Sequence, residues 1–189
     1  MPELIQQLDE QVLVWIAQHV RNGLLDPIMS FYTKLGDAGL LFIVLGLALL
    51  LFRPTRRAGF SALCAMVIGL VVVNFTVKPL VNRPRPWVVI EGFVNLVEEK
   101  DPHSFPSGHT NAAFAFAVAL CMTAPRRWMK IAAVCAGVVM GLSRLYVGVH
   151  FPSDVLAGAV IGSLCGFAGA WVVKKVWERL GPRLRKAPE

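Results

Sequence analysis

The feature of this chain that most constrains its fold is a series of apolar segments of nearly membrane-spanning length. A helix crosses the hydrocarbon core of a bilayer with about 20 residues, and it satisfies its backbone hydrogen bonds internally. Five segments approach that length, and they cover residues 35–52, 58–77, 110–124, 128–147 and 155–173. The sequence therefore predicts an all-α integral membrane protein, a helical bundle of about five transmembrane helices.

The overall composition agrees with a membrane protein. Hydrophobic residues make up 56% of the chain and charged residues 16%, whereas a soluble domain carries about 25% charged residues. The net charge of +7 could indicate a nucleic-acid partner. However, the basic residues lie at the ends of apolar segments and form no continuous stripe. We therefore expect no nucleic-acid partner, and we assign the surplus charge to membrane topology and contact with anionic lipids.

The first 34 residues have a different pattern from the rest of the chain. Apolar side chains recur there at helical spacing between polar and acidic ones, at Leu4, Ile5, Leu8, Val12, Trp15 and Ile16. This pattern is typical of an amphipathic helix lying at the membrane interface. We expect a single membrane domain over residues 1–189, made of an interfacial helix region (1–34), a transmembrane core (35–177) and a basic cytoplasmic tail (178–189).

Basic residues mark one side of the predicted bundle. They follow the first, third and fifth apolar segments, at Arg53, Arg56, Arg57, Arg126, Arg127, Lys130, Lys174, Lys175, Arg179, Arg183, Arg185 and Lys186. The positive-inside rule places such residues in the cytoplasm. We therefore expect a multi-pass protein of the cell (inner) membrane with its C-terminus in the cytoplasm and its N-terminus outside.

Three polar clusters lie at the opposite ends of the apolar segments, on the predicted periplasmic or exterior side. They cover residues 78–86, 106–109 and 143–154. Ionisable groups within or beside membrane spans are costly, and they are functional candidates by default. Together the clusters supply guanidinium, ammonium, imidazole and carboxylate groups, an inventory that suits attack of a histidine on a phosphate.

The remaining acids and the cysteines do not suggest a metal. The loop between the first two clusters carries Glu91, Glu98, Glu99 and Asp101 without His or Asp at ligand spacing, and the cysteines Cys64, Cys121, Cys135 and Cys165 form no metal-type pair. We therefore expect no metal and no other cofactor. Lysine and arginine would supply the positive charge.

His150 and Asp154 have the spacing of a nucleophile and the group that orients it. Pro152 suits the first position of a helix, which puts Asp154 in the first turn. His150 can then fold back so that Asp154 accepts one ring N–H. The other ring nitrogen would be free to attack phosphorus.

The tetrapeptide Pro106-Ser107-Gly108-His109 reads as the start of another helix. Ser107 is a natural N-cap, and Gly108 permits close approach of the backbone to an anion. His109 in the first turn is suited to protonating the leaving group.

The basic residues of the first and third clusters are candidates for holding a phosphate. Lys78 and Arg85 flank a proline-stiffened segment that could hold two cations over one pocket, and Arg144 offers a bidentate fork for phosphate. Arg83 is expected only to anchor lipid headgroups. His103 is expected to be a loop histidine with no chemical role.

Taken together, the clusters resemble the three-part signature of the type 2 phosphatidic acid phosphatase superfamily. The matching residues are Lys78-(six residues)-Arg85-Pro86, Pro106-Ser107-Gly108-His109 and Ser143-Arg144-(five residues)-His150-(three residues)-Asp154. The resemblance implies a phosphohistidine intermediate on His150, His109 as the acid and Asp154 as the orienting group. It also implies that the phosphate is surrounded by Lys78, Arg85, Ser107, Gly108, Ser143 and Arg144. The superfamily includes soluble vanadate-dependent haloperoxidases, which the apolar segments here disfavour.

The sequence identifies the substrate less specifically than it identifies the family. Short bacterial members of the superfamily resemble undecaprenyl-diphosphate phosphatases, so we expect a phosphorylated lipid, undecaprenyl diphosphate, as the substrate. Phosphatidylglycerol phosphate, phosphatidic acid and lipid A phosphates are alternatives, and a lipid-phosphate transporter without hydrolysis is an alternative of another class. The segment 87–104 is our candidate for a lid or a headgroup-selecting loop.

Overall fold

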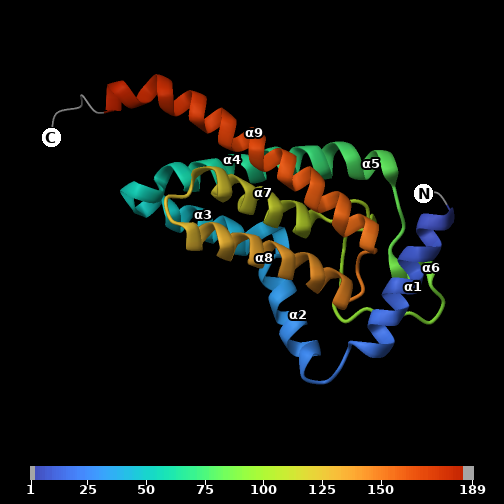
Figure 1. Ribbon diagram of the computed structural model, residues 1–189. Helices are drawn as coiled ribbons and strands as arrows, with labels where there is room; N and C mark the ends of the chain where they lie inside the picture. Colours follow the sequence, from blue (N-terminus) through green and yellow to red (C-terminus); the bar gives the residue numbers. More distant parts are fainter. Residues whose placement is uncertain (1–2, 185–189) are drawn as a thin grey trace.

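The protein folds into helices joined by loops (Figure 1). In this computed structural model residues 3–184 are described, with side-chain surroundings to residue 179, and no strand occurs among them. The helices are α1 (Glu3–His19), α2 (Leu25–Leu35), α3 (Leu40–Leu51), α4 (Arg56–Val72), α5 (Lys78–Val81), α6 (Pro86–Val89), α7 (Gly108–Thr123), α8 (Arg127–Tyr146) and α9 (Pro152–Leu184). The predicted all-α fold is confirmed.

Helix α7 lies at the centre of the bundle and packs against α4, α8 and α9. Its buried face is built largely of alanine, including Ala113, Ala115 and Ala119. On α9, Gly158 and Gly162 face the backbone of α7 so closely that a Cβ on Gly158 would come within 2.6 Å of the Ser107 carbonyl oxygen. Small residues on both helices therefore allow the close backbone contact typical of membrane bundles.

The membrane character predicted from the apolar segments is confirmed, although fewer helices than five meet a length and hydropathy criterion. Within the described residues, Arg53–Val89, Arg127–Tyr146 and Pro152–Arg179 are long and apolar enough to cross a membrane, and the bent pair Leu25–Leu35 and Asp37–Leu51 could form a fourth span. Helix α7, with 16 residues, is shorter than the length needed to cross the hydrocarbon core without help. Its neighbours shield it, because it occupies the middle of the bundle.

The N-terminal region differs from expectation in one element. Helix α1 forms where the amphipathic pattern predicted it, and it lies across one end of the bundle, where it contacts α8 and α9 (Figure 1). Helix α2 was not predicted, and the first apolar helix begins at Leu40 instead of residue 35. The reason is a break at residues 36–39, where Ala38 and Gly39 adopt positive φ angles of 51° and 74°. The two helices therefore meet at a bend of 52°.

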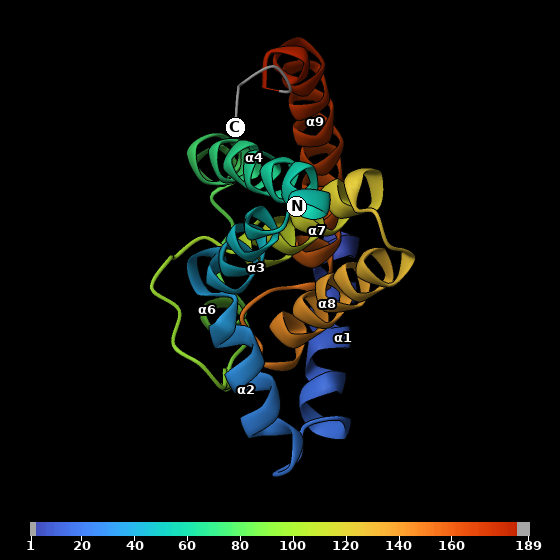
Figure 2. The ribbon, with the colours of Figure 1, turned by 90° about the vertical axis from the view of Figure 1, so that its left-hand side faces the viewer.

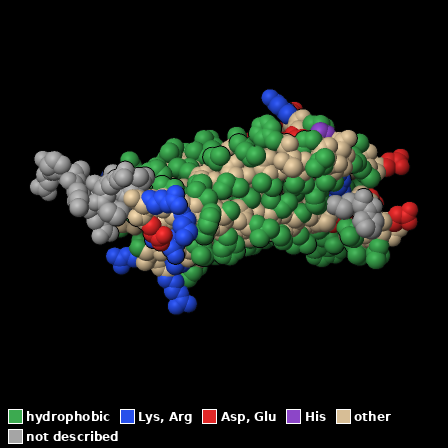
Figure 3. Space-filling model, turned by 90° about the horizontal axis from the view of Figure 1, so that it is seen from above, with side chains coloured by type: hydrophobic (Ala, Val, Ile, Leu, Met, Phe, Trp, Pro, Cys, Tyr) green, Lys and Arg blue, Asp and Glu red, His purple; other side chains and the backbone are tan. Residues whose placement is uncertain are grey.

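Seen along its length, the bundle has α7 in its middle (Figure 2), and its two ends differ in charge (Figure 3). In Figure 3, lysine and arginine side chains gather at one end of the described bundle, and a broad hydrophobic band separates them from the other end, where acidic side chains and some basic ones lie. The basic end contains the α3–α4 turn and the α7–α8 turn, as the loop charges predicted. Within the predicted basic tail, Arg185 and Lys186 lie outside the described residues.

Candidate active site

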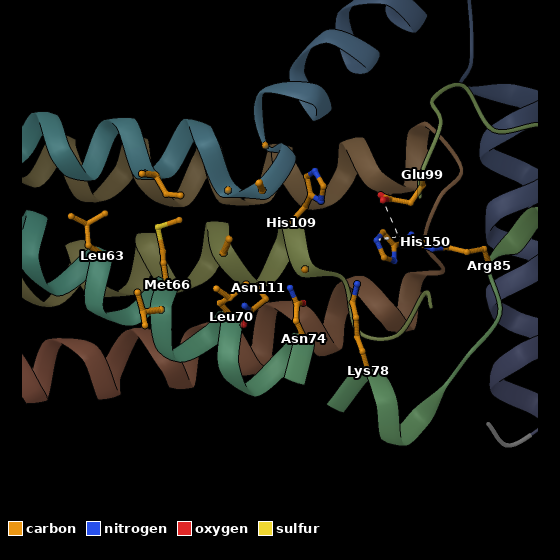
Figure 4. Close-up of a pocket in the computed structure, with 17 residues that line it drawn as sticks. Leu63, Met66, Leu70, Asn74, Lys78, Arg85, Glu99, His109, Asn111 and His150 are labelled. Atoms are coloured by element: carbon orange, nitrogen blue, oxygen red, sulfur yellow. Dashed lines mark hydrogen bonds and ion pairs between the residues drawn. The ribbon is translucent and has the colours of Figure 1, made fainter. Parts of the chain in front are cut away.

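A cavity of about 560 Å³ lies between α3, α4 and α7 and extends to the end of α7 that carries His109 (Figure 4). Its polar end is lined by Lys78, Arg85, Glu99, His109 and His150. Its other end is lined by apolar side chains, namely Ile43, Leu63, Met66, Val67 and Leu70. Both Val67 and Leu70 are exposed as well as lining the cavity. The cavity thus connects a charged end with an apolar end that opens at the surface of the molecule.

The polar end brings together residues from all three sequence clusters. Lys78 begins α5, directly after a π-helical turn (Val73–Val77) that ends the long α4 segment. Arg85 caps the start of α6, His109 stands in the first turn of α7, and His150 lies in the loop between α8 and α9. The predicted convergence of the clusters on one cavity is therefore observed.

His150 and Asp154 lie next to each other as their spacing predicted, but the expected hydrogen bond from the ring to the carboxylate is not formed, and Nδ1 of His150 has no hydrogen-bond partner among the described residues. The Nδ1 atom of His150 lies 3.6 Å from Asp154 Oδ2, and its Nε2 atom lies 3.1 Å from Arg85 Nη1. Burial, reinforced by Arg85 and Arg144, lowers the pKa of His150 well below its ordinary value. A lowered pKa favours the neutral ring, in which one of the two nitrogens carries no proton.

His109 has a carboxylate partner that the sequence did not reveal. Its Nε2 atom lies 3.0 Å from Oδ1 of Asp37, in the short 3-10 turn Asp37–Gly39 that follows α2. Ser107 caps α7 as predicted and accepts a bond from the Thr110 backbone N–H at 3.4 Å. An acid beside glycine in an otherwise apolar stretch was the signal that could have drawn attention to Asp37.

Three buried cations at the polar end are paired with carboxylates of the loop that precedes α7. Lys78 binds Asp101, and Arg144 Nη2 donates to Glu99 Oε2 at 2.5 Å. Arg85 Nη2 lies 3.9 Å from Glu99 and 4.0 Å from Asp101. For Asp101, burial opposes ionisation, but the bonds from Lys78 and the His103 backbone outweigh it and lower the pKa of the carboxyl group.

The other predicted phosphate-binding residues differ in whether they face the cavity. The backbone of Gly108 lines the cavity. The Ser107 hydroxyl accepts a bond from Thr110 Oγ1 at 2.9 Å, and the Ser143 hydroxyl donates to the Met140 carbonyl at 2.7 Å. Both hydroxyls are therefore engaged within their own helices in this arrangement.

For two residues outside the signature, Arg83 and His103, the sequence predicted no part in the chemistry. The expectation that Arg83 only anchors headgroups is wrong, because its side chain is buried against Asp9 and Asp154. His103 lies beside Asp101, with Nδ1 3.5 Å from Oδ1. Within residues 3–184, no group of three or more His, Cys, Asp and Glu side chains is arranged to hold a metal ion.

Comparison with known proteins agrees with this geometry. The chain is 32% identical to an undecaprenyl-diphosphatase of Sulfolobus acidocaldarius over 82% of its own length and 77% of that protein. The crystal structure of Aquifex aeolicus LpxE superposes with a TM-score of 0.72 at 30% identity, covering 88% of this chain and 94% of that one. A transmembrane PAP2 type phosphatidylglycerolphosphate phosphatase from Bacillus subtilis superposes with a TM-score of 0.71 at 29% identity, covering 94% and 88%.

The fold and the cavity thus define a helical membrane phosphatase. The family model of the PAP2 superfamily matches residues 58–178, which contain all three motifs, and the chain belongs to that superfamily.

Proposed function

We propose that this protein removes the terminal phosphate of undecaprenyl diphosphate and releases undecaprenyl phosphate, a step that recycles the lipid carrier of peptidoglycan synthesis. The observation that carries the proposal is the single cavity, whose cationic end continues into an apolar end. A lipid diphosphate needs both parts, because its chain is apolar and its headgroup is anionic. The Sulfolobus relative named as an undecaprenyl-diphosphatase supports the same substrate.

In the proposed reaction, His150 is the nucleophile. Its Nε2 atom attacks the terminal phosphorus, the N–P bond forms, and the bond from phosphorus to the bridging oxygen breaks. Lys78, Arg85 and Arg144 stabilise the negative charge on the equatorial oxygens, and the backbone at Gly108 approaches the same group. The phosphate replaces the loop carboxylates that neutralise these cations in the free protein.

His109 moves the protons in this scheme. Burial and the neighbouring cations lower the pKa of His109 to about 2 in the free protein, so this step requires that the bound anionic phosphate raise that pKa. The protonated ring then donates its proton to the departing oxygen, which leaves as undecaprenyl phosphate. As a base it then takes a proton from water, which attacks the phosphohistidine and releases inorganic phosphate. Asp154 orients His150 throughout. Ser107 and Ser143 would contact the phosphate only if their hydroxyls rotate away from their present partners.

The charge distribution supports a location for the reaction. We propose a protein of the cell (inner) membrane with the basic end in the cytoplasm, since positive residues favour that side. The cavity's polar end would then face the periplasm or cell exterior. We also propose that no metal or other cofactor takes part, because three cationic side chains already surround the phosphate position.

Phosphate release by purified protein tests the proposal. Wild type and His150→Ala are assayed in detergent with undecaprenyl diphosphate, phosphatidylglycerol phosphate and phosphatidic acid. We expect the highest kcat/KM for undecaprenyl diphosphate, with full activity in a chelator. A wild-type rate no higher than that of His150→Ala would refute hydrolysis and favour the transporter alternative, and chelator inhibition reversed by magnesium would refute metal independence.

A second candidate substrate is phosphatidylglycerol phosphate. It is favoured by the close superposition on the Bacillus subtilis phosphatase. A kcat/KM higher for this lipid than for undecaprenyl diphosphate would replace our first choice with it, while leaving the histidine chemistry intact.

A further inference from the structure

Arg83 lies at the junction of three separate parts of the chain. From the loop between α5 and α6, its Nη1 atom donates to Asp154 Oδ1 at 2.5 Å and to Ser153 Oγ at 2.8 Å. Its Nη2 atom donates to Asp9 Oδ2 at 2.7 Å. The guanidinium also stacks 4.0 Å above the ring centre of Phe151. This one side chain therefore links the first motif, the third motif and helix α1.

The two oxygens of the Asp154 carboxylate have different neighbours. Oδ1 receives Arg83, whereas Oδ2 accepts the Phe151 backbone N–H at 2.8 Å and faces Nδ1 of His150. Asp154 and His150 are both buried. An ionised carboxylate in such a position is costly unless it is paired and hydrogen-bonded. Arg83 supplies both the compensating charge and the bond that fixes the direction of the carboxylate.

Asp9 holds the other side of the same guanidinium. It is buried in α1, and its Oδ1 atom accepts the Ser153 backbone N–H at 2.9 Å, at the start of α9. Its Oδ2 atom also accepts the Ser153 hydroxyl. A buried aspartate on the polar face of an otherwise surface-lying helix is unexpected. It balances the charge of Arg83 and ties α1 to the helix that carries Asp154.

We propose that Arg83 and Asp9 are positioning residues of the reaction, which hold Asp154 oriented toward His150 and make α1 part of the catalytic unit. The inference rests on the hydrolysis through His150 proposed above. It predicts that a change on α1, outside the three motifs, alters turnover. Arg83 is not among the residues that line the cavity, so phosphate binding should be spared.

The test compares Arg83→Gln, Arg83→Lys and Asp9→Asn with wild type on undecaprenyl diphosphate. We expect Arg83→Gln to lower kcat by about 10- to 100-fold, by analogy with the loss of residues that orient the ligands of a metal. KM and the inhibition constant for inorganic phosphate should change less than about twofold. Arg83→Lys, which keeps the charge, should recover part of kcat, and Asp9→Asn should lower it by a smaller factor than Arg83→Gln.

Arg21→Gln is the matched control. Arg21 also links the N-terminal region to the bundle, through bonds to the Tyr146 and Val94 carbonyls at 2.9 and 2.7 Å, but it does not contact Asp154. Equal losses of kcat in the two arginine variants, accompanied by equal drops in unfolding temperature, would show a purely structural role. If Arg83→Gln does not fold, Asp9→Asn alone decides, and wild-type kcat in that variant overturns the inference.

The pH profile separates positioning from general destabilisation. The charged and titratable groups around Asp154 are Arg83 beside it, His150 in front of it, Asp9 behind Arg83 and Arg85 beyond His150. Loss of the Arg83 charge disfavours the carboxylate form, so the acid limb of kcat should move to higher pH. An unmoved limb together with wild-type kcat would refute the inference. An active wild type with an equally active His150→Ala variant would instead refute the proposed function.

Discussion

Two histidines that line the cavity, His150 and His109, each lie beside a carboxylate, and the two pairs differ in their access to water. In the sealed pair, His150 and Asp154, the side chains are 2% and 0% exposed and the closest approach is 3.6 Å. In the open pair, His109 and Asp37, they are 13% and 65% exposed and the approach is 3.0 Å. A nucleophile benefits from a fixed, unprotonated ring, whereas an acid that becomes a base must exchange protons with water. The contrast therefore matches the two roles proposed for the histidines.

Removal of each histidine in turn is the most direct test of the different roles assigned to the two pairs. We expect His150→Ala to lose activity by about 10³-fold or more, since no nucleophile remains. His109→Ala should lose turnover but still form the covalent intermediate when the leaving group needs no protonation. An activated aryl phosphate labelled at phosphorus should therefore leave label on His109→Ala protein and none on His150→Ala protein. Label retained by His150→Ala would place the nucleophile elsewhere.

Substitution of the two carboxylates should also lower kcat more in the sealed pair than in the open pair, with smaller losses than substitution of the histidines. Asp154→Asn should lower kcat by roughly 10²- to 10⁴-fold, because loss of a buried orienting carboxylate leaves the histidine in the wrong tautomer. Asp37→Asn should lower it by only about 3- to 10-fold, since an exposed carboxylate is screened by water. Steady-state kinetics on undecaprenyl diphosphate measures both. Equal losses would mean that exposure does not distinguish the pairs.

The sealed pair could be predicted from the sequence, and the open pair could not. His150 and Asp154 are four residues apart at the start of a helix, so local geometry brings them together. His109 and Asp37 are separated by 72 positions. Their contact depends on the bend at residues 36–39, which turns α2 away from α3 and was absent from the predicted continuous span.

The same reasoning explains which parts of the site were missed. The three motifs lie at helix ends on the same side of the bundle, so their convergence could be predicted from the order and direction of the helices. The pairing of Arg83 with Asp9 crosses 74 positions, and the pairing of Arg144 with Glu99 depends on the path of an irregular loop. Local patterns carry no signal for either contact. Arg83 was therefore expected at the surface, although it is buried.

Substitution of a loop carboxylate should have a smaller effect. These carboxylates neutralise the cations at the polar end of the cavity. Glu99→Gln removes the anionic partner of Arg144 and should strengthen inhibition by inorganic phosphate by about tenfold, equivalent to about 1.4 kcal/mol. Glu98→Gln is the matched control, since the Glu98 carboxylate forms no ion pair with a described residue. Equal inhibition constants in Glu99→Gln and wild type would show that the loop carboxylate does not compete with phosphate.

The smallest expected effect is the dependence of stability on pH that arises from the sealed histidine. The pKa of His150 is lowered by burial in the folded protein, whereas it is about 6.5 in the unfolded chain. Below that pH the unfolded chain binds a proton that the folded protein does not, so the free energy of unfolding falls as pH falls. One such group contributes up to about 1.4 kcal/mol per pH unit.

The measurement is the unfolding temperature of the detergent-solubilised protein between pH 7.5 and pH 5. It should decrease toward low pH, and the decrease should be shallower in His150→Ala, which lacks the buried imidazole. His19→Ala is a suitable control, because His19 is exposed on α1. A slope in His150→Ala as steep as in wild type would mean that the imidazole is not held neutral, which would remove the physical basis for assigning it the nucleophile's role.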